Sequence, residues 1–233
     1  MFVSREGLIF PSGKSPSFDP SFSGAYNTRL SVVTFGGAPV NILRGIRGTT
    51  GGAPAYSTNG TVGFVATFPN VGAGDRYLFS GVGPAAQDLT YTMAAIFYVT
   101  TISAAAQWIL HGSNTSSGVG INLAATTGIL NVTIPGVAST SAGTAVVANV
   151  PYFFAASGNQ SGPRQNYVVV RLDNGQVFGT TSVTAGTPAA NDGNMIVGNR
   201  STLVLPLLGG VAAVMYSTQF LSLPQLLEWG ASP

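Results

Sequence analysis

Seven carboxylates are the first residues in this sequence that could perform acid–base chemistry, and none of them forms a close pair: Glu6, Asp19, Asp75, Asp88, Asp173, Asp192 and Glu228. A glycosidase needs two carboxylates at a fixed separation, one of them acting as general acid. The two glutamates lie near opposite ends of the chain, and no strand-like segment carries acids at alternate positions. The sequence therefore argues against glycoside hydrolysis.

The chain has one histidine, His111, which follows the apolar run Trp108-Ile109-Leu110 and precedes Gly112. A catalytic triad requires a histidine that is oriented by a carboxylate and bonded to a serine, and no Gly-x-Ser-x-Gly elbow occurs. We expect a solvated histidine at a turn. Because the chain also lacks cysteine, thiolate metal sites and cysteine nucleophiles are excluded. The sequence predicts no enzymatic activity and no cofactor.

Calcium is the metal that the remaining residues could bind, through one carboxylate with amide and backbone oxygens. Asp88 and Asp192 are the candidate ligands. A single carboxylate binds calcium weakly, and the Asn-Asp-Gly-Asn sequence at residues 191–194 is equally typical of a metal-free turn. Both interpretations stay open.

Ionisable residues are scarce throughout the 233 residues: 7% are charged and 45% are hydrophobic, against roughly 25% charged in an average soluble domain. Lys14 is the one lysine, and lysine is depleted from interface cores. The composition favours a protein that works through contact with other subunits. A compositional bias of the genome that favours arginine explains it equally well.

Composition also bears on other partners. The net charge of +2 is spread thinly along the chain, whereas nucleic-acid binders concentrate basic residues on one face. No apolar run approaches the length of a transmembrane helix, and the first residues lack the pattern of a secretory signal. We expect no nucleic-acid or membrane partner, and synthesis in a cytoplasm without export.

Short segments rich in Val, Ile, Thr, Tyr and Phe recur from about residue 29 onward, with turn residues every eight to twelve positions, which is typical of a sandwich. We expect an all-β, two-sheet antiparallel jelly-roll sandwich. The predicted strands are residues 30–35, 63–68, 77–81, 91–100, 107–111, 119–124, 129–134, 152–157, 166–172, 176–183, 194–198 and 208–216. One short helix is predicted near the C-terminus, from a capping box of Ser222 and Gln225 to Gly230.

Two hairpins are recognisable. Asp173-Asn174-Gly175 joins two apolar segments and supplies the positive φ that a tight turn requires. Thr126-Thr127-Gly128 joins another pair. In the second strand of that pair Ile129, Asn131 and Thr133 alternate with apolar residues, so we expect one face to be buried and the other to meet water or a partner.

Residues 1–28 form a separate Pro- and Ser-rich segment, an extended N-terminal arm preceding a single domain over residues 29–233. Each proline favours extended geometry in the residue before it. The arm either wraps its own domain or docks on a neighbouring subunit through Leu8, Ile9, Phe10 and Phe18.

The strand chemistry resembles that of concanavalin A-like, laminin-G-type jelly rolls over roughly residues 29–229. Val170-Arg171-Leu172-Asp173-Asn174-Gly175 is similar to the family's Tyr-Val-Asp-Gly hairpin. Residues 195–200, then 208–217, then Leu221-Ser222 and the terminal helix resemble its C-terminal ending. The arm is similar to leaders that precede such domains in tailed-phage and prophage proteins. Family members bind glycans, bind proteins or act as structural modules, so the resemblance implies the fold and leaves the activity open.

Two functions follow as hypotheses. The first is a non-enzymatic bacteriophage virion protein, a capsid decoration (cement) or head-associated protein that oligomerises on the particle and contacts the major capsid protein. The second is a carbohydrate-binding, lectin-like adhesion module of a tail fibre or cell surface, with glycan contacts at Tyr56, Trp108 and Asn114, and in the loops of Asp88 and Asp192.

Overall fold

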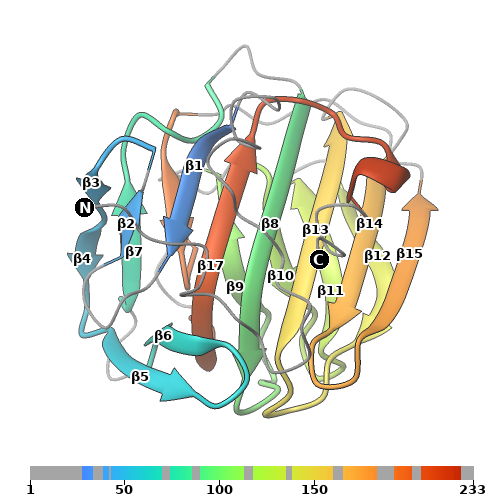
Figure 1. Ribbon diagram of the computed structural model, residues 1–233, viewed down its shortest axis with the longest axis horizontal. Helices are drawn as coiled ribbons and strands as arrows, with labels where there is room; N and C mark the ends of the chain where they lie inside the picture. Colours follow the sequence, from blue (N-terminus) through green and yellow to red (C-terminus); the bar gives the residue numbers. More distant parts are fainter. Residues whose placement is uncertain are drawn as a thin grey trace.

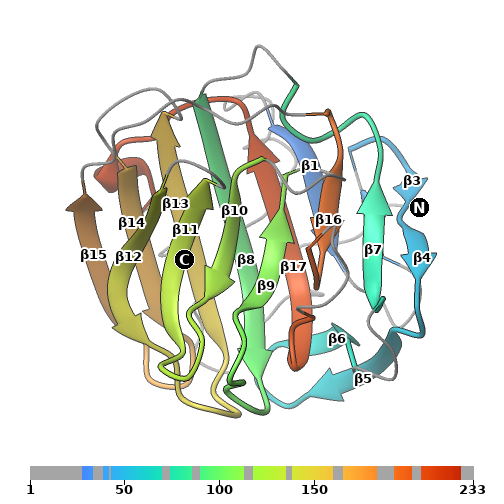
Figure 2. The same cartoon turned by 180° about the vertical axis from the view of Figure 1, so that it is seen from behind.

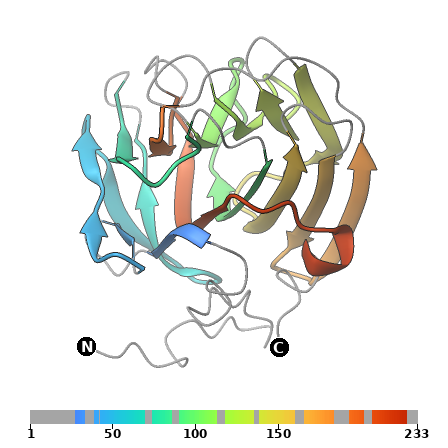
Figure 3. The ribbon, with the colours of Figure 1, turned by 90° about the horizontal axis from the view of Figure 1, so that it is seen from above.

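A computed structural model describes residues 28–33, 39–41, 43–69, 74–85, 90–112, 118–134, 138–159, 165–182, 192–200 and 206–226. Two antiparallel sheets pack face to face in this part of the chain (Figure 1). Seen from above, the sheets form two layers (Figure 3). The all-β, jelly-roll-like sandwich predicted from the sequence is confirmed.

Sheet A contains ten strands in the described residues. Eight lie in the order β15-β14-β13-β8-β17-β1-β2-β3, and the β5–β6 hairpin joins through β6, which pairs with β17. Their bounds are β1 Thr28–Val33, β2 Val40–Asn41, β3 Ile46–Arg47, β5 Ala55–Asn59, β6 Gly63–Thr67, β8 Thr90–Val99, β13 Tyr152–Asn159, β14 Gln165–Arg171, β15 Gln176–Ser182 and β17 Gly209–Ser217.

Sheet B contains seven strands in the described residues, in the order β12-β11-β10-β9-β16-β7-β4 (Figure 2). Their bounds are β4 Thr49–Gly51, β7 Arg76–Phe79, β9 Gln107–His111, β10 Gly120–Leu123, β11 Ile129–Ile134, β12 Ala138–Ala145 and β16 Met195–Val197. Each predicted strand has a counterpart in the two sheets. The sequence did not predict β2, β3, β4, β5 or β12, because these strands are very short or consist mainly of small and polar residues.

The core between the sheets is built by alternation along each strand. Met93, Ala95 and Phe97 of β8 belong to the cluster between the sheets, whereas Ala94 and Ile96 belong to a second apolar cluster. Successive side chains of a strand point to opposite faces, so this second cluster lies on the outer face of sheet A. Sheet A is therefore apolar on both faces.

The helical turn at residues 223–226 has the predicted cap. The Ser222 N–H donates to the side-chain oxygen Oε1 of Gln225 at 2.9 Å, and the Leu226 N–H donates to the Ser222 carbonyl at 3.0 Å. Leu221 and Leu226 join the apolar cluster on the outer face of sheet A. Within the described residues no helix is long and apolar enough to cross a bilayer.

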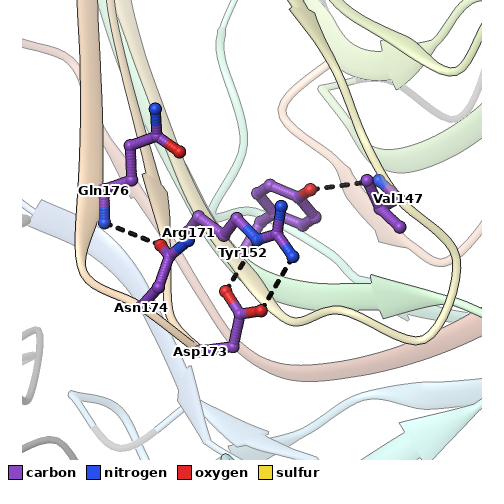
Figure 4. Close-up of polar contacts among 6 residues, drawn as sticks. All are labelled: Val147, Tyr152, Arg171, Asp173, Asn174 and Gln176. Carbon is purple, nitrogen blue, oxygen red and sulfur yellow. Dashed lines mark hydrogen bonds and ion pairs between the residues drawn. The ribbon is translucent and has the colours of Figure 1, made fainter.

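The β14–β15 hairpin confirms the turn predicted from Asp173-Asn174-Gly175. Gly175 has φ of 71°, and the Asn174 side-chain oxygen accepts the Gln176 N–H at 2.9 Å (Figure 4). Arg171 donates two hydrogen bonds to the Asp173 carboxylate, at 2.7 and 2.9 Å. This pairing lowers the pKa of Asp173, so the one acid in this turn is occupied as an ion-pair partner.

We predict that Phe154→Ala destabilises the fold by about 3–5 kcal/mol, because it removes a fully buried ring. Phe154 is 0% exposed and stacks on Tyr167, with ring centroids 6.2 Å apart. Urea unfolding measures the loss. The matched control is Phe64→Ala, at a ring that is 49% exposed, which should stay within about 0.5 kcal/mol of wild type. Equal effects of the two substitutions would contradict the placement of the core.

A second prediction concerns alkaline pH. Burial raises the pKa of Tyr91 well above its ordinary value, whereas an unfolded tyrosine ionises near pH 10. The contribution of this group to stability is therefore complete below about pH 10 and is lost as the pH rises above it. Urea unfolding between pH 8 and 11 should show a shallower alkaline decline for Tyr91→Phe than for wild type. An identical decline would contradict the burial of this hydroxyl.

Candidate functional site

Four residues line up across neighbouring strands on the outer face of sheet B. Trp108 of β9 lies opposite Asn122 of β10, Asn122 lies opposite Asn131 of β11, and Asn131 lies opposite Ser141 of β12. Directly opposed residues share a face. Neighbouring strands are about 4.8 Å apart, so these four residues, here called the polar row, cross the sheet at regular spacing. Figure 2 shows the four strands β9, β10, β11 and β12 side by side.

The polar row faces away from the core because its neighbours along each strand face inward. Ile121 and Leu123 flank Asn122, Leu130 and Val132 flank Asn131, and all four belong to the cluster between the sheets. The row is deepest at the tryptophan: Trp108 is 2% exposed and Asn122 is 4% exposed. Asn131 is partly exposed and Ser141 is exposed. The row thus rises from a buried aromatic end to an open hydroxyl end.

A parallel line of residues supports the row. His111 lies opposite Gly120, and Gly120 lies opposite Thr133. The side-chain nitrogen Nδ2 of Asn122 donates to Oγ1 of Thr133 at 3.0 Å, which orients the Asn122 amide. A Cβ atom at position 120 would lie 2.5 Å from Cζ3 of Trp108. The indole therefore lies across Gly120, where only glycine leaves room for it.

Trp108 is held from two further directions. The His111 ring meets it edge-on, with centroids 4.8 Å apart and planes at 74°. The guanidinium carbon of Arg200 lies 5.4 Å from the indole centroid, within the range of a cation–π contact. His111 is 0% exposed, so the expectation of a solvated histidine was wrong. It lies at the end of β9, where its ring is buried and contacts the indole.

Two buried polar atoms at the deep end of the row have no hydrogen-bond partner in the structure: Nε1 of Trp108, a donor, and Oδ1 of Asn122, an acceptor. Buried polar atoms are nearly always bonded, and an unsatisfied one costs about 1–3 kcal/mol. The two residues are directly opposed in the sheet.

The other predicted glycan contact that the structure describes lies elsewhere. Tyr56 is on β5, is 40% exposed, and accepts a hydrogen bond from the Tyr77 hydroxyl. Tyr77 belongs to the cluster between the sheets, and its burial raises its pKa. Because Tyr56 reaches the inner side of sheet B, it does not share a site with Trp108. Asn114 lies outside the described residues.

The predicted calcium ligands are not brought together either. Asp192 is exposed, and its side-chain oxygen accepts the Asn194 N–H at 3.1 Å, which is the geometry of an Asx turn. Asp88 and the arm residues Leu8, Ile9, Phe10 and Phe18 lie outside the described residues. Where the structure describes the chain, no three metal-ligating side chains cluster.

Three carboxylates are described, and each belongs to a different element. Asp75 precedes β7, is fully buried, and accepts the Ala53 N–H at 2.8 Å. Asp173 pairs with Arg171 in the β14–β15 turn, and Asp192 lies before β16. None of the three is in the polar row. The arrangement offers the row no acid–base pair.

A small cavity is lined by Pro39, Ala66, Val197 and residues 211–214. Its volume is about 10 Å³, which is room for roughly one water molecule. The walls are apolar. It is a packing gap without the polar groups that a ligand site needs.

The sequence singles out Trp108 but not Asn122 or Ser141, which the pairing register places in the same row. The role of Trp108 in glycan binding stays a prediction. The alternation through Ile129, Asn131 and Thr133 did indicate an outward-facing strand, and the structure confirms that face. The residues opposite Asn131 depend on the pairing register of the strands, which the sequence alone does not give. A slip of one residue would turn the other face of the strand outward.

The comparisons with known proteins identify structures that share this fold. No family model and no curated protein sequence matches this chain. Among solved structures, domain 4 of AbnA, a GH43 extracellular arabinanase from Geobacillus stearothermophilus in complex with arabinotriose, matches with a TM-score of 0.61 and 12% identity. The match covers 88% of this chain and 98% of that domain.

Two further structures share the sandwich. Trypanosoma rangeli sialidase matches with a TM-score of 0.58 and 11% identity, covering 95% of this chain and 35% of the sialidase. Tailspike protein 2 of Escherichia coli O157:H7 bacteriophage CAB120 matches with a TM-score of 0.50 and 16% identity, covering 75% of this chain and 26% of the tailspike. Identities this low show a common β-sandwich and nothing about activity.

We predict that Gly120→Ala displaces the indole of Trp108 and lowers stability by about 1–3 kcal/mol, the usual cost of overpacking. The added Cβ would also lie 2.7 Å from the Leu110 carbonyl oxygen. Near-ultraviolet circular dichroism and urea unfolding report both effects. Gly60→Ala is the matched control, because a Cβ there meets nothing within 4 Å. If the two variants behaved alike, the indole would not lie across Gly120.

Proposed function

We propose that this chain is a non-catalytic carbohydrate-binding module that takes a neutral oligosaccharide along the polar row on the outer face of sheet B. This role corresponds to an adhesion module of a tail fibre or cell surface. The observation that carries the proposal is the register of the row, which aligns an indole, two amides and a hydroxyl across four strands.

The chemistry of the row suits neutral sugars. An amide has both donors and an acceptor, and a hydroxyl both donates and accepts, so each row residue matches a sugar hydroxyl. No residue of the row itself carries a charge, and the one cation described beside it, the Arg200 guanidinium, packs on the indole at the deep end. At the deep end Trp108 and Asn122 are almost fully buried, so the ligand would bind over the shallower Asn131 and Ser141.

The structural neighbours support the same proposal through their scaffold. The arabinanase domain, 98% of which matches this chain, was solved with arabinotriose. At 12% identity the two proteins share the sandwich fold. The neighbour therefore supports arabinotriose as a first probe of binding, and it does not identify the sugar that this chain binds. The separation of the three described carboxylates supports a binding role without hydrolysis.

Capsid decoration is the other function expected from the composition. The comparisons give it no support, since the tailspike is a different kind of virion protein and shares only the fold. Attachment to a major capsid protein, oligomerisation and location on a virion stay predictions. A carbohydrate-binding module on a phage tail would be compatible with virion location.

The test is binding of the full chain to arabinotriose and to an array of neutral oligosaccharides, measured for wild type and for Asn131→Ala. We expect at least one neutral glycan to bind, and the variant to bind it about tenfold more weakly, equivalent to about 1.4 kcal/mol. Asn131 is partly exposed, so its substitution should leave the fold intact.

The matched control is Asn174→Ala, in the β14–β15 turn at the edge of sheet A. It should bind as wild type does. Absence of binding to every neutral glycan, or equal loss in the two variants, would contradict the proposal.

A further inference from the structure

The two sheets end in edge strands, each of which has a neighbouring strand on one side only among the described residues. β15 and β3 end sheet A, β12 and β4 end sheet B, and β5 is the free side of the β5–β6 hairpin. An edge strand is a template on which another strand can add. Natural proteins protect such edges with very short strands, charges, prolines or bulges.

Four of these described edges carry a protection of this kind. β3 has two residues, one of them Arg47, and β4 has three. The register of β12 against β11 shifts between Ile129 and Asn131, which marks a bulge. β5 begins directly after Pro54, and its aromatic residue Tyr56 is hydrogen-bonded to Tyr77.

Strand β15 has none of these protections. Its seven residues pair with β14 in one unbroken register and include neither a charged residue nor a proline. Val177 and Phe178 are 44% and 37% exposed, and as neighbours in a strand they belong to opposite faces. Figure 2 shows β15 as the outermost strand on its side of the sandwich. β12 of sheet B lies alongside β14 and β15.

We propose that β15 pairs antiparallel with β15 of a second copy of this chain, so that sheet A continues across a two-fold axis. Full overlap of the seven residues places this axis at Gly179 and sets Phe178 opposite Thr180 of the second copy. An aromatic residue opposite a β-branched residue is a favourable cross-strand pair. A contact of one strand with itself is isologous and closes as a dimer.

The charges of the hairpin suit a second copy as the partner. No residue of β15 is charged, so no like charges meet when the strand pairs with itself. Arg171 and Asp173, at the turn of the hairpin, form an ion pair with each other. The hairpin therefore approaches its copy without a net charge, and its edge needs no oppositely charged partner.

The dimer has a consequence for the polar row. Antiparallel strands of one sheet are related by a two-fold axis perpendicular to the sheet, so both copies keep sheet B on the same side. The polar rows of the two copies would then face in one direction. This consequence rests on the proposed function and would give a bivalent glycan-binding surface with increased avidity. The pairing of β15 does not depend on glycan binding.

Sedimentation equilibrium of the full chain, without glycan, tests the association. One strand pair makes an interface below the standard size of roughly 1,600 Å², so we expect a reversible dimer within a range of about 1 μM to 1 mM. Phe178→Lys should lower the association constant by at least roughly tenfold, because lysine protects an edge strand. Phe64→Lys, at a ring that is 49% exposed on β6, is the matched control and should associate as wild type does.

A chain that stays monomeric over the whole range, as it would if its own residues or a foreign strand were the partner of β15, overturns the inference. Equal losses in Phe178→Lys and Phe64→Lys overturn it too. Neither result bears on glycan binding by the polar row, which is measured separately.

Single cysteines test the register, because the chain contains no cysteine. At the axis, residue 179 lies about 4.5–5.5 Å from its copy between Cα atoms, within reach of a disulfide. Residue 177 lies about 14 Å from its copy, which is too far. Gly179→Cys should therefore give a disulfide-linked dimer on oxidation, and the matched control Val177→Cys should not. Absence of the Gly179→Cys crosslink, or equal crosslinking of both variants, would contradict the pairing.

Discussion

Burial of one face of every central strand between the two sheets is the constraint on which the rest of the structure depends. Tyr91, Met93, Phe97 and their counterparts from sheet B fill this core. Because side chains alternate along a strand, fixing the inward set also fixes the outward set. A slip of one residue would move Asn122 and Asn131 into the apolar core, where the Asn122 amide would lose its hydrogen bond to Thr133.

The same constraint leaves the two outer faces with different properties. On sheet A the outward residues are again apolar and buried, as with Ile96 and Phe153. On sheet B the outward residues include Asn122 and Asn131, which form a row that ends at Trp108. One sandwich thus carries an apolar outer face on sheet A and, at Asn131 and Ser141, an uncharged polar one on sheet B. The scarcity of charged residues suits both faces, since neither depends on ion pairs.

Much of the fold could be predicted from the sequence, because strongly apolar strands and glycine turns are local signals. The β14–β15 turn with Gly175 is one example. Strand β12 was not predicted because its Ala, Ser, Thr and Gly residues carry no strand signal. This segment becomes a strand through its pairing with β11. His111 was misjudged for a related reason: its burial and its contact with the Trp108 ring are tertiary features that sequence spacing does not reveal. The polar row needed the register of three strand pairs, which is a tertiary property.

The central claim is that the outward amides of sheet B contact a neutral glycan. The most direct measurement is the nuclear magnetic resonance signals of the Asn122 and Asn131 side-chain amides during titration with the oligosaccharide that binds best. The account predicts that these two signals and the Trp108 indole N–H shift together and saturate at one concentration. Shifts confined to Tyr56 and the β5–β6 hairpin, with the three row signals unchanged, would contradict it.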